Sequence, residues 1–117
     1  TLSVSSLDGS NGLVIYGRDS EDWFGYSVAS GDINGDGYAD IIIGANGGDG
    51  ISNSAHFTGE AAIVFGKASG WSATLSASSL DGSNGLVIYG RDSEDWFGYS
   101  VASGDINGDG YADIIIG

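Results

Sequence analysis

Two acidic nonapeptides are the segments of this chain best suited to chemistry. The first runs from Asp32 to Asp40 (DINGDGYAD), and the same residues return from Asp105 to Asp113. Oxygen side chains at positions 1, 3, 5 and 9, with a glycine at position 6 to turn the backbone, can surround a hard cation such as Ca²⁺. We expect about one Ca²⁺ per loop and two per chain. The predicted ligands are Asp32, Asn34, Asp36, Tyr38 (through its carbonyl) and Asp40, and then Asp105, Asn107, Asp109, Tyr111 and Asp113.

The alternative interpretation of each nonapeptide is a polar turn whose acids point into water, because Asn-Gly-Asp-Gly is a good turn sequence. An EF-hand is excluded, since its position 12 is a bidentate glutamate and Ile43 stands there. Mg²⁺ fits less well than Ca²⁺, because it favours fewer protein ligands and keeps several waters.

The nonapeptides belong to a longer internal repeat. Residues 1–44 return at 74–117 with one change, Val4 to Ala77, so the period is 73 residues. The chain therefore holds about 1.6 units, a first unit over 1–73 and a truncated second unit over 74–117. A repeat unit usually cannot bury its apolar face alone. We therefore expect this sequence to be part of a longer array or to complete its fold with other chains.

Short apolar runs bounded by glycine or polar residues predict an all-β fold. No window has the apolar spacing of a helix. The continuously apolar runs at 41–43 and 63–65 predict strands covered on both faces. Along residues 24–30 large residues alternate with small ones, which suits a place where sheets converge. Four strands per unit fit the blade of a β-propeller, whereas residues 45–59 are glycine-rich and predict a long loop.

A family resemblance rests on the order of these motifs. Phe24-Gly25, the first nonapeptide and Ile41-Ile-Ile-Gly44-Ala45 together resemble the FG-GAP repeat of integrin α-subunits and of secreted bacterial proteins. The resemblance implies blades of four antiparallel strands in a seven-bladed propeller, with Ca²⁺ in the loop between the first two strands. The chain departs from the motif at Asn46, which stands in place of the proline of "GAP", and it has too few strands for a closed ring.

Cut as the family implies, the blade has strands at 24–30, 40–45, 61–66 and 86–90. An orphan outer strand at 13–17 then opens the chain, and an inner pair at 98–117 closes it. Both ends would leave sheet edges unpaired, and exposed edges invite pairing with another chain. We expect self-association into a ring or filament, or neighbouring repeats in a longer chain.

Composition excludes several classes of partner. The net charge of −13, from 16 acidic and three basic residues, argues against nucleic acid and against anionic membrane surfaces. No apolar stretch approaches the length of a membrane span, and the absence of cysteine excludes disulfides.

Enzyme chemistry has little support in the sequence. The single histidine, His56, lies in the long loop, where a solvated role is expected. Asp19, Glu21 and Asp22 could serve glycoside hydrolysis, but beside Arg18 they favour a hydrated turn.

The sequence thus predicts a non-enzymatic, extracellular or cell-surface Ca²⁺-binding scaffold or adhesion module. Its possible ligands are a glycan or a protein. The alternative function is a lectin-like propeller that uses the 45–60 loop and the tryptophans. Trp23 and Phe24 are instead expected to anchor the contact between blades, with the tryptophans in the core.

Overall fold

The computed structural model of the chain describes residues 3–117, so Thr1 and Leu2 of the first repeat unit lie outside the described residues. It contains eight strands and two short 3₁₀ turns, η1 (Val4–Ser6) and η2 (Ala77–Ser79). The described part has no α-helix, and therefore none that could cross a membrane. The all-β prediction is confirmed.

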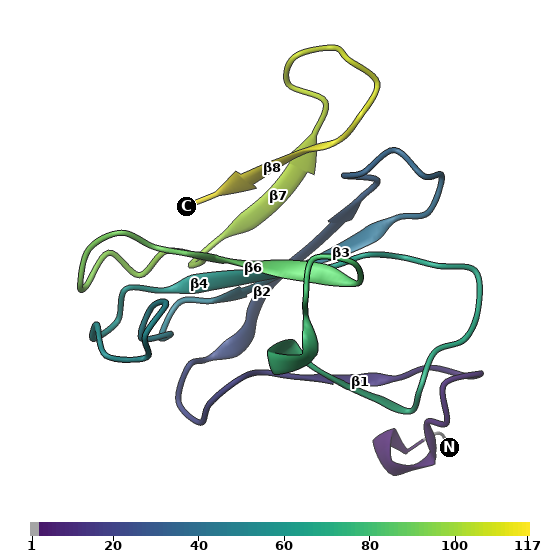
Figure 1. The fold of residues 1–117 in the computed structure, drawn as a ribbon, viewed down its shortest axis with the longest axis horizontal. Coiled ribbons are helices and arrows are strands. Elements are labelled where there is room, and N and C mark those ends of the chain that lie inside the picture. Colours follow the sequence, from purple (N-terminus) through teal and green to yellow (C-terminus); the bar gives the residue numbers. More distant parts are fainter. Residues whose placement is uncertain (1–2) are drawn as a thin grey trace.

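The centre of the molecule is a four-stranded antiparallel sheet in the order β2-β3-β4-β6 (Figure 1). Its strands are β2 (Phe24–Gly31), β3 (Asp40–Ala45), β4 (Glu60–Val64) and β6 (Gly85–Tyr89). The register pairs Val28 with Ile43 and Ile43 with Ala62. This is the predicted blade, and its boundaries differ by one or two residues from those expected.

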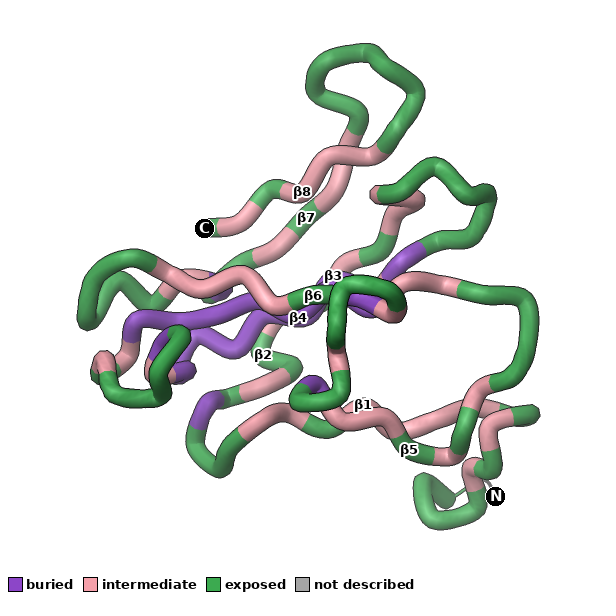
Figure 2. Tube along the Cα trace, in the orientation of Figure 1, coloured by how far each residue is buried: buried purple, intermediate pink, exposed green. Residues whose placement is uncertain are grey.

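The core of the blade lies on β3 and β4, drawn purple in Figure 2. Both strands are continuously apolar over most of their length, and Ile42, Ile63 and Val64 are almost fully buried. Strands covered on both faces need no polar alternation. The prediction from the runs at 41–43 and 63–65 is therefore confirmed for these two central strands.

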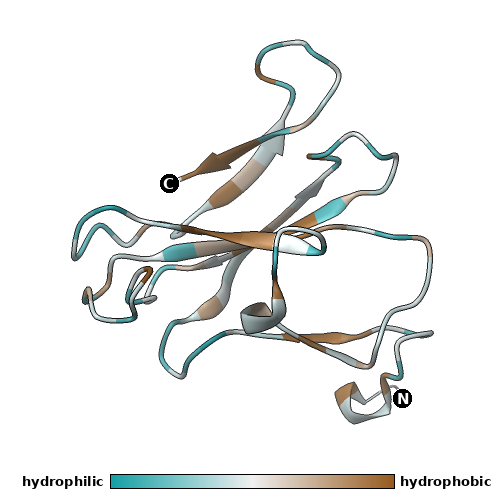
Figure 3. Ribbon diagram, in the orientation of Figure 1, coloured by the Kyte–Doolittle hydropathy of each residue, from teal (hydrophilic) through white to brown (hydrophobic). Residues whose placement is uncertain are grey.

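The second repeat unit contributes a separate hairpin of β7 (Val101–Gly104) and β8 (Asp113–Ile116). This hairpin lies against β2 of the first unit (Figure 1), and apolar residues occupy parts of both its strands (brown in Figure 3). This hairpin corresponds to the inner pair of strands predicted at 98–117, and its two strands cover only part of that range.

The prediction of an orphan strand at 13–17 is wrong. Strand β1 (Val14–Tyr16) pairs in parallel with β5 (Thr74–Ser76), which lies in the link between β4 and β6. The backbone N–H of Val14 donates to the carbonyl of Ala73 at 3.0 Å. The link contains Leu75, which is paired with Ile15. The many serines of the link gave no sign of this short strand in the sequence.

Candidate metal centre

Each nonapeptide closes an antiparallel hairpin. Asp32 follows directly on β2 and Asp40 is the first residue of β3; Asp105 and Asp113 stand in the same places on β7 and β8. Because Gly31 is paired with Asp40, the hairpin brings the first and last acid of the loop to one end of the sheet. The strands therefore position the candidate ligands.

The side chain of Asp32 organises the first loop. Its Oδ1 accepts hydrogen bonds from the backbone N–H groups of Gly35 (2.8 Å) and Asp36 (3.1 Å), and its Oδ2 accepts from Gly37 (2.9 Å). Gly35 and Gly37 have φ values of 74° and 89°, in the left-handed region that glycine enters without steric cost. Gly37 is position 6 of the nonapeptide, so the glycine expected to turn the backbone there does so.

Two further oxygen-bearing side chains, Asn34 and Asp36, also turn towards the backbone of the loop. Oδ1 of Asp36 accepts from the N–H of Tyr38 at 3.0 Å, and Oδ1 of Asn34 accepts from the N–H of Asp36 at 3.4 Å. Residues Asn34, Asp36 and Tyr38 remain exposed to solvent. The loop is thus an ordered turn in which side-chain oxygens hold the backbone amides.

Asp40 differs from the other candidate ligands because it is completely buried. Its Oδ2 accepts from the N–H of Ile33 and its Oδ1 from the N–H of Gly66, both at 2.8 Å. Gly66 lies just beyond β4, so one carboxylate joins the loop, the start of β3 and the chain that leaves β4. A buried ionised carboxylate requires such partners.

The second loop has the same internal pattern. Asp105 accepts from Gly108, Asp109 and Gly110 at 2.8, 3.0 and 2.9 Å, and Asp109 accepts from Tyr111 at 2.9 Å. Asp113 is only half-buried, and its Oδ2 accepts from Ile106 at 2.8 Å. The local sequence therefore produces the same loop in two different surroundings.

The donor set fits a hard divalent cation by its chemistry. Within residues 3–117, no three Asp, Glu or His side chains converge closely enough to hold a metal by themselves. The loop carboxylates accept backbone N–H bonds, and in the described part of the chain none of them pairs with Lys or Arg. A carboxylate has about four acceptor sites, so each retains oxygen lone pairs, and none of them forms an ion pair with a described side chain.

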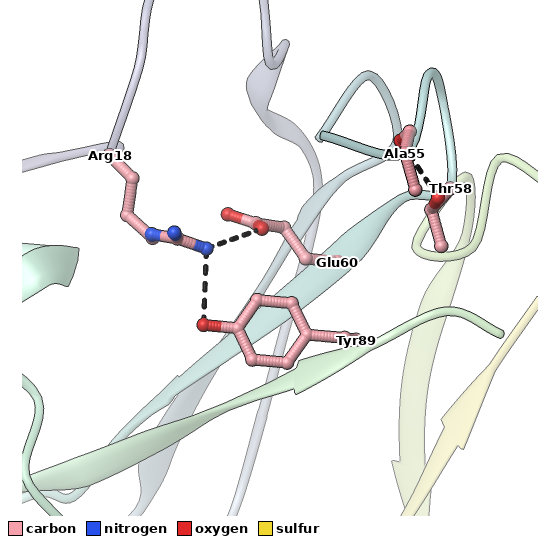
Figure 4. Close-up of polar contacts among 5 residues, drawn as sticks. All are labelled: Arg18, Ala55, Thr58, Glu60 and Tyr89. Carbon is pink, nitrogen blue, oxygen red and sulfur yellow. Dashed lines mark hydrogen bonds and ion pairs between the residues drawn. The ribbon is translucent and has the colours of Figure 1, made fainter. Parts of the chain in front are cut away.

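The structure also contains a largely buried polar cluster that was not expected from the sequence, the Glu60 cluster of Arg18, Asp22, Glu60 and Tyr89. Nη1 of Arg18 donates to Oε2 of Glu60 at 2.9 Å and to the hydroxyl of Tyr89 at 3.1 Å (Figure 4). Arg18 therefore ties the turn after β1 to both β4 and β6. The prediction of a hydrated turn is wrong for Arg18 and Asp22, whereas Asp19 and Glu21 are exposed.

Burial dominates the electrostatics of the Glu60 cluster. It raises the pKa of Glu60 to about 7, although Arg18 acts in the opposite direction. Burial also raises the pKa of Asp22, with a further contribution from the charge of Asp19. Within residues 3–117, Oδ2 of Asp22 and both polar side-chain atoms of the buried Asn46 have no hydrogen-bond partner. The sequence signal was Glu60 itself, an acid directly before the apolar run of β4.

Contrary to the expectation from the sequence, the tryptophans do not lie in the core. Trp23 and Trp96 are 47% and 40% exposed, and their rings meet edge to face at 6.2 Å, across the contact between the two units. Trp71 is half-buried and lines a pocket of about 360 Å³ that Asn34, Asp36 and Lys67 also line. His56 is exposed, and its ring lies against that of Phe57 at an interplanar angle of 40°. The 45–59 segment is a loop, as predicted, and much of it is buried.

The segments that contain the two loops also match a known protein family. The family model of the FG-GAP repeat matches residues 24–64 and 97–117, which include both nonapeptides and the strands around them. The chain belongs to the FG-GAP repeat family. The FG-GAP match covers most of the central blade and all of the β7–β8 hairpin, so this family repeat is the structural unit described above.

Two integrin α chains are among the relatives of this FG-GAP chain. It is 36% identical to integrin alpha-V of Gallus gallus over 97 residues, which are 83% of this chain and 8% of the relative. It is 35% identical to integrin alpha-7 of Rattus norvegicus over 106 residues, 90% of this chain and 8% of the relative.

A third relative is named as an enzyme and not as an integrin. The chain is 34% identical to a phosphatidylinositol-glycan-specific phospholipase D of Dictyostelium discoideum over 122 residues, 99% of this chain and 13% of the relative. The FG-GAP chain thus spans about a tenth of the length of these curated relatives.

Proposed function

We propose that this FG-GAP chain is a Ca²⁺-stabilised module of an extracellular propeller, with a structural or adhesive role. The observation that carries the proposal is the pair of hairpin loops that present the same oxygen donors and form no ion pair with a described cationic side chain. A divalent cation supplies that missing positive charge. The resemblance to integrin α chains supports a cell-surface or secreted location.

The residues that would hold the ion belong to one hairpin. Asp32, Asn34 and Asp36 lie along the loop, Tyr38 offers its backbone carbonyl, and Asp40 lies at the start of β3; the second loop offers the equivalent five. When bound, Ca²⁺ links oxygen ligands from both ends of the hairpin and thereby stabilises the folded state, as any ligand that binds only that state does. Extracellular sites of this kind have dissociation constants on the order of 10⁻⁴ to 10⁻³ M.

Calcium titration tests this role directly. Isothermal titration calorimetry of the 117-residue chain should give two Ca²⁺ per chain, and EDTA should lower its melting temperature. The test variant is D36N/D109N. It keeps the loop length and the glycines but removes one carboxylate from each site. It should bind Ca²⁺ at least tenfold more weakly. An absence of Ca²⁺ heat, together with a melting temperature unaffected by EDTA, would overturn the proposal.

The proposed role is non-enzymatic, although one relative of the chain is named as a phospholipase D. Asp19 and Glu21 are exposed and separate from the pocket beside Trp71. Asp22 and Glu60 are buried, each only 3% exposed. Assay of the chain on phosphatidylinositol-glycan and on glycosides should give no turnover, and turnover that is lost in D19N or E21Q would contradict this.

A lectin-like role is a second candidate, because one pocket combines an aromatic ring with polar loop residues. Trp71, Lys67, Asn34 and Asp36 line it, and the ammonium of Lys67 lies 4.8 Å from the centre of the Trp71 ring. Sugar rings stack on aromatic faces and bind through polar groups at their edge. The 45–60 loop, which was expected to form the sugar site, does not line this pocket. A glycan array with the wild type and W71A distinguishes the two roles.

A further inference from the structure

The pocket of about 360 Å³ lies beside the segment that joins β4 to β5. This segment leaves the end of β4 as a wide arc and then forms β5, which pairs with β1 (Figures 1 and 2). The residues that line the pocket run from Leu13 to Asn84, a span shorter than one period of 73 residues. One unit's length of chain is therefore enough to build a cavity of the size that holds a small molecule.

The walls of this pocket combine apolar and polar side chains. Leu13, Leu75 and the ring of Trp71 line it and are half-buried, and Ser72 and Thr74 line it from exposed positions. Ligand pockets have this mixture, an apolar lining with a few polar groups that fix the orientation of the ligand. A pyranose ring has matching surfaces, because its C–H faces are apolar and its hydroxyls lie around its edge.

Lys67 and Trp71 form a clasp within the arc, which we call the Lys67 clasp. Nζ of Lys67 donates to the carbonyl of Gly70 at 3.0 Å and lies 4.8 Å from the centre of the Trp71 ring. Nε1 of Trp71 donates to the carbonyl of Lys67 at 3.2 Å. These two bonds, and the attraction of an ammonium to an aromatic face, hold both side chains at the pocket. A site held in place in this way costs less entropy to occupy.

The charge of Lys67 differs from that of the other basic side chains. The sequence has three lysine and arginine residues. Arg18 pairs with Glu60 at 2.9 Å, and Arg91 pairs with Asp92, also at 2.9 Å. In the described part of the chain Lys67 forms no ion pair, although the sequence has 16 acidic residues. An ammonium has three N–H donors and the clasp uses one, so Lys67 can still bind an anionic group.

We propose that this pocket binds an acidic sugar, a pyranose ring that carries a carboxylate. The ring packs against Trp71, Leu13 and Leu75, and the carboxylate accepts hydrogen bonds from the ammonium of Lys67. This proposal rests on the lectin-like role and names the class of sugar for it. A neutral sugar leaves the charge of Lys67 without a partner, so the acidic sugar binds more tightly.

The probes separate the ring from the charge. The acidic probes are the methyl glycosides of glucuronic and galacturonic acid. The neutral probes are the methyl glycosides of glucose and galactose, which have the same rings without the carboxylate, and acetate has the carboxylate without the ring. Titration of the isotope-labelled 117-residue chain, in buffer without divalent ions, is followed by its backbone amide resonances, which report both affinity and location.

An acidic probe should shift the amides of residues 66–75. It should bind about fivefold more tightly than its neutral counterpart, the effect of one exposed ion pair, and more tightly than acetate. Equal affinity for acidic and neutral probes would overturn this proposal and leave the lectin-like role standing. If no sugar bound, both would be wrong. The calcium proposal is tested without sugar, so its failure is separate from either result.

Three variants assign the selectivity to Lys67. K67M keeps the aliphatic stem but removes the charge, so it should lose the preference for the acidic probes, and K67R should restore it. R91Q is the matched control, because it removes one positive charge from the chain, as K67M does, at a residue that does not line the pocket. R91Q should bind as the wild type does. Equal losses in K67M and R91Q would overturn the proposal, since net charge and not Lys67 would then select the ligand.

Asp36 provides a test with the opposite sign. It is the one acid among the described residues that line the pocket, and its charge opposes an anionic ligand. In buffer without divalent ions, D36N should therefore strengthen the binding of an acidic probe about twofold and leave that of a neutral probe unchanged. Equal affinity of D36N and the wild type for the acidic probe would mean that its carboxylate does not lie in this pocket, and would overturn the proposal.

Discussion

The carboxylate of Asp40 accepts a hydrogen bond of 2.8 Å from the backbone N–H of Gly66, a residue just beyond the end of the neighbouring strand β4. Asp40 has no described cationic partner and is completely buried. It joins the candidate metal loop to the end of β4, so the loop and the blade core are one structural unit. Within the described residues, Asp113, which has the same local sequence, accepts only from Ile106 and Asn107 of its own loop.

That difference predicts unequal effects of the same substitution. D40A leaves the N–H groups of Ile33 and Gly66 without their acceptor, and hydrogen bonds to charged groups contribute about 1.5–3 kcal/mol each. D113A removes an acceptor that is only half-buried, so it should cost about 1 kcal/mol. Urea unfolding in EDTA, where metal plays no part, should rank D40A as the less stable variant, and equal losses would contradict this role for Asp40.

Each metal loop should act independently. D36N should reduce the stoichiometry of bound Ca²⁺ from two to one, and D109N should do the same, because each removes a carboxylate from one loop only. Isothermal titration calorimetry measures this. The variant S52A, in the 45–59 loop, is the control and should keep both sites. If D36N retained two sites of unchanged affinity, Asp36 would not be a ligand.

The Glu60 cluster predicts a pH dependence of stability. The folded state raises the pKa of Glu60 from 4.5 to about 7 because burial disfavours the charged form. The protonated acid is thus favoured in the folded state, so its contribution is present at low pH and is lost as the pH rises from 4.5 to 7. At about 1.4 kcal/mol per unit of pKa, the change is on the order of 3 kcal/mol.

The variant E60Q isolates this contribution, since glutamine keeps the shape of the acid and does not titrate. Between pH 5 and pH 7, the melting temperature of the wild type should fall relative to that of E60Q. E94Q is a suitable control, because Glu94 is exposed and belongs to the other repeat unit. Parallel melting curves for wild type and E60Q across this range would show that Glu60 does not titrate there.

The contact between the units predicts a position-specific effect within one chain. V101R places a charge where Val101 is partly covered by the first unit, whereas V28R places the same charge on an exposed strand position. Hydrogen exchange should show lost protection across β7 and β8 in V101R. It should show native protection in V28R. Protection of β7 and β8 in V101R equal to that in V28R would mean that the contact does not hold the hairpin.

The four-stranded blade was predictable because its signals are local. Apolar runs bounded by glycine identified β2, β3, β4 and β6, and the alternation along 24–30 anticipated the small residues at the contact between the units. The nonapeptide could be located, and the positive φ of Gly37 expected, since both depend on neighbouring residues. The parallel pairing of β1 with β5 was not predictable, because the link around Leu75 resembles a polar loop and its partner lies 60 residues away.

What the sequence alone determined is the repeat, the strands and the composition of the loops, since hydrophobic spacing and turn residues act over a few positions. Only the tertiary structure decided that Arg18 meets Glu60 and that Asp40 reaches Gly66. It also decided that Val28 is open while Val101 is covered. Identical residues cannot differ by their own chemistry, so these differences come from the neighbours that the fold places around each copy.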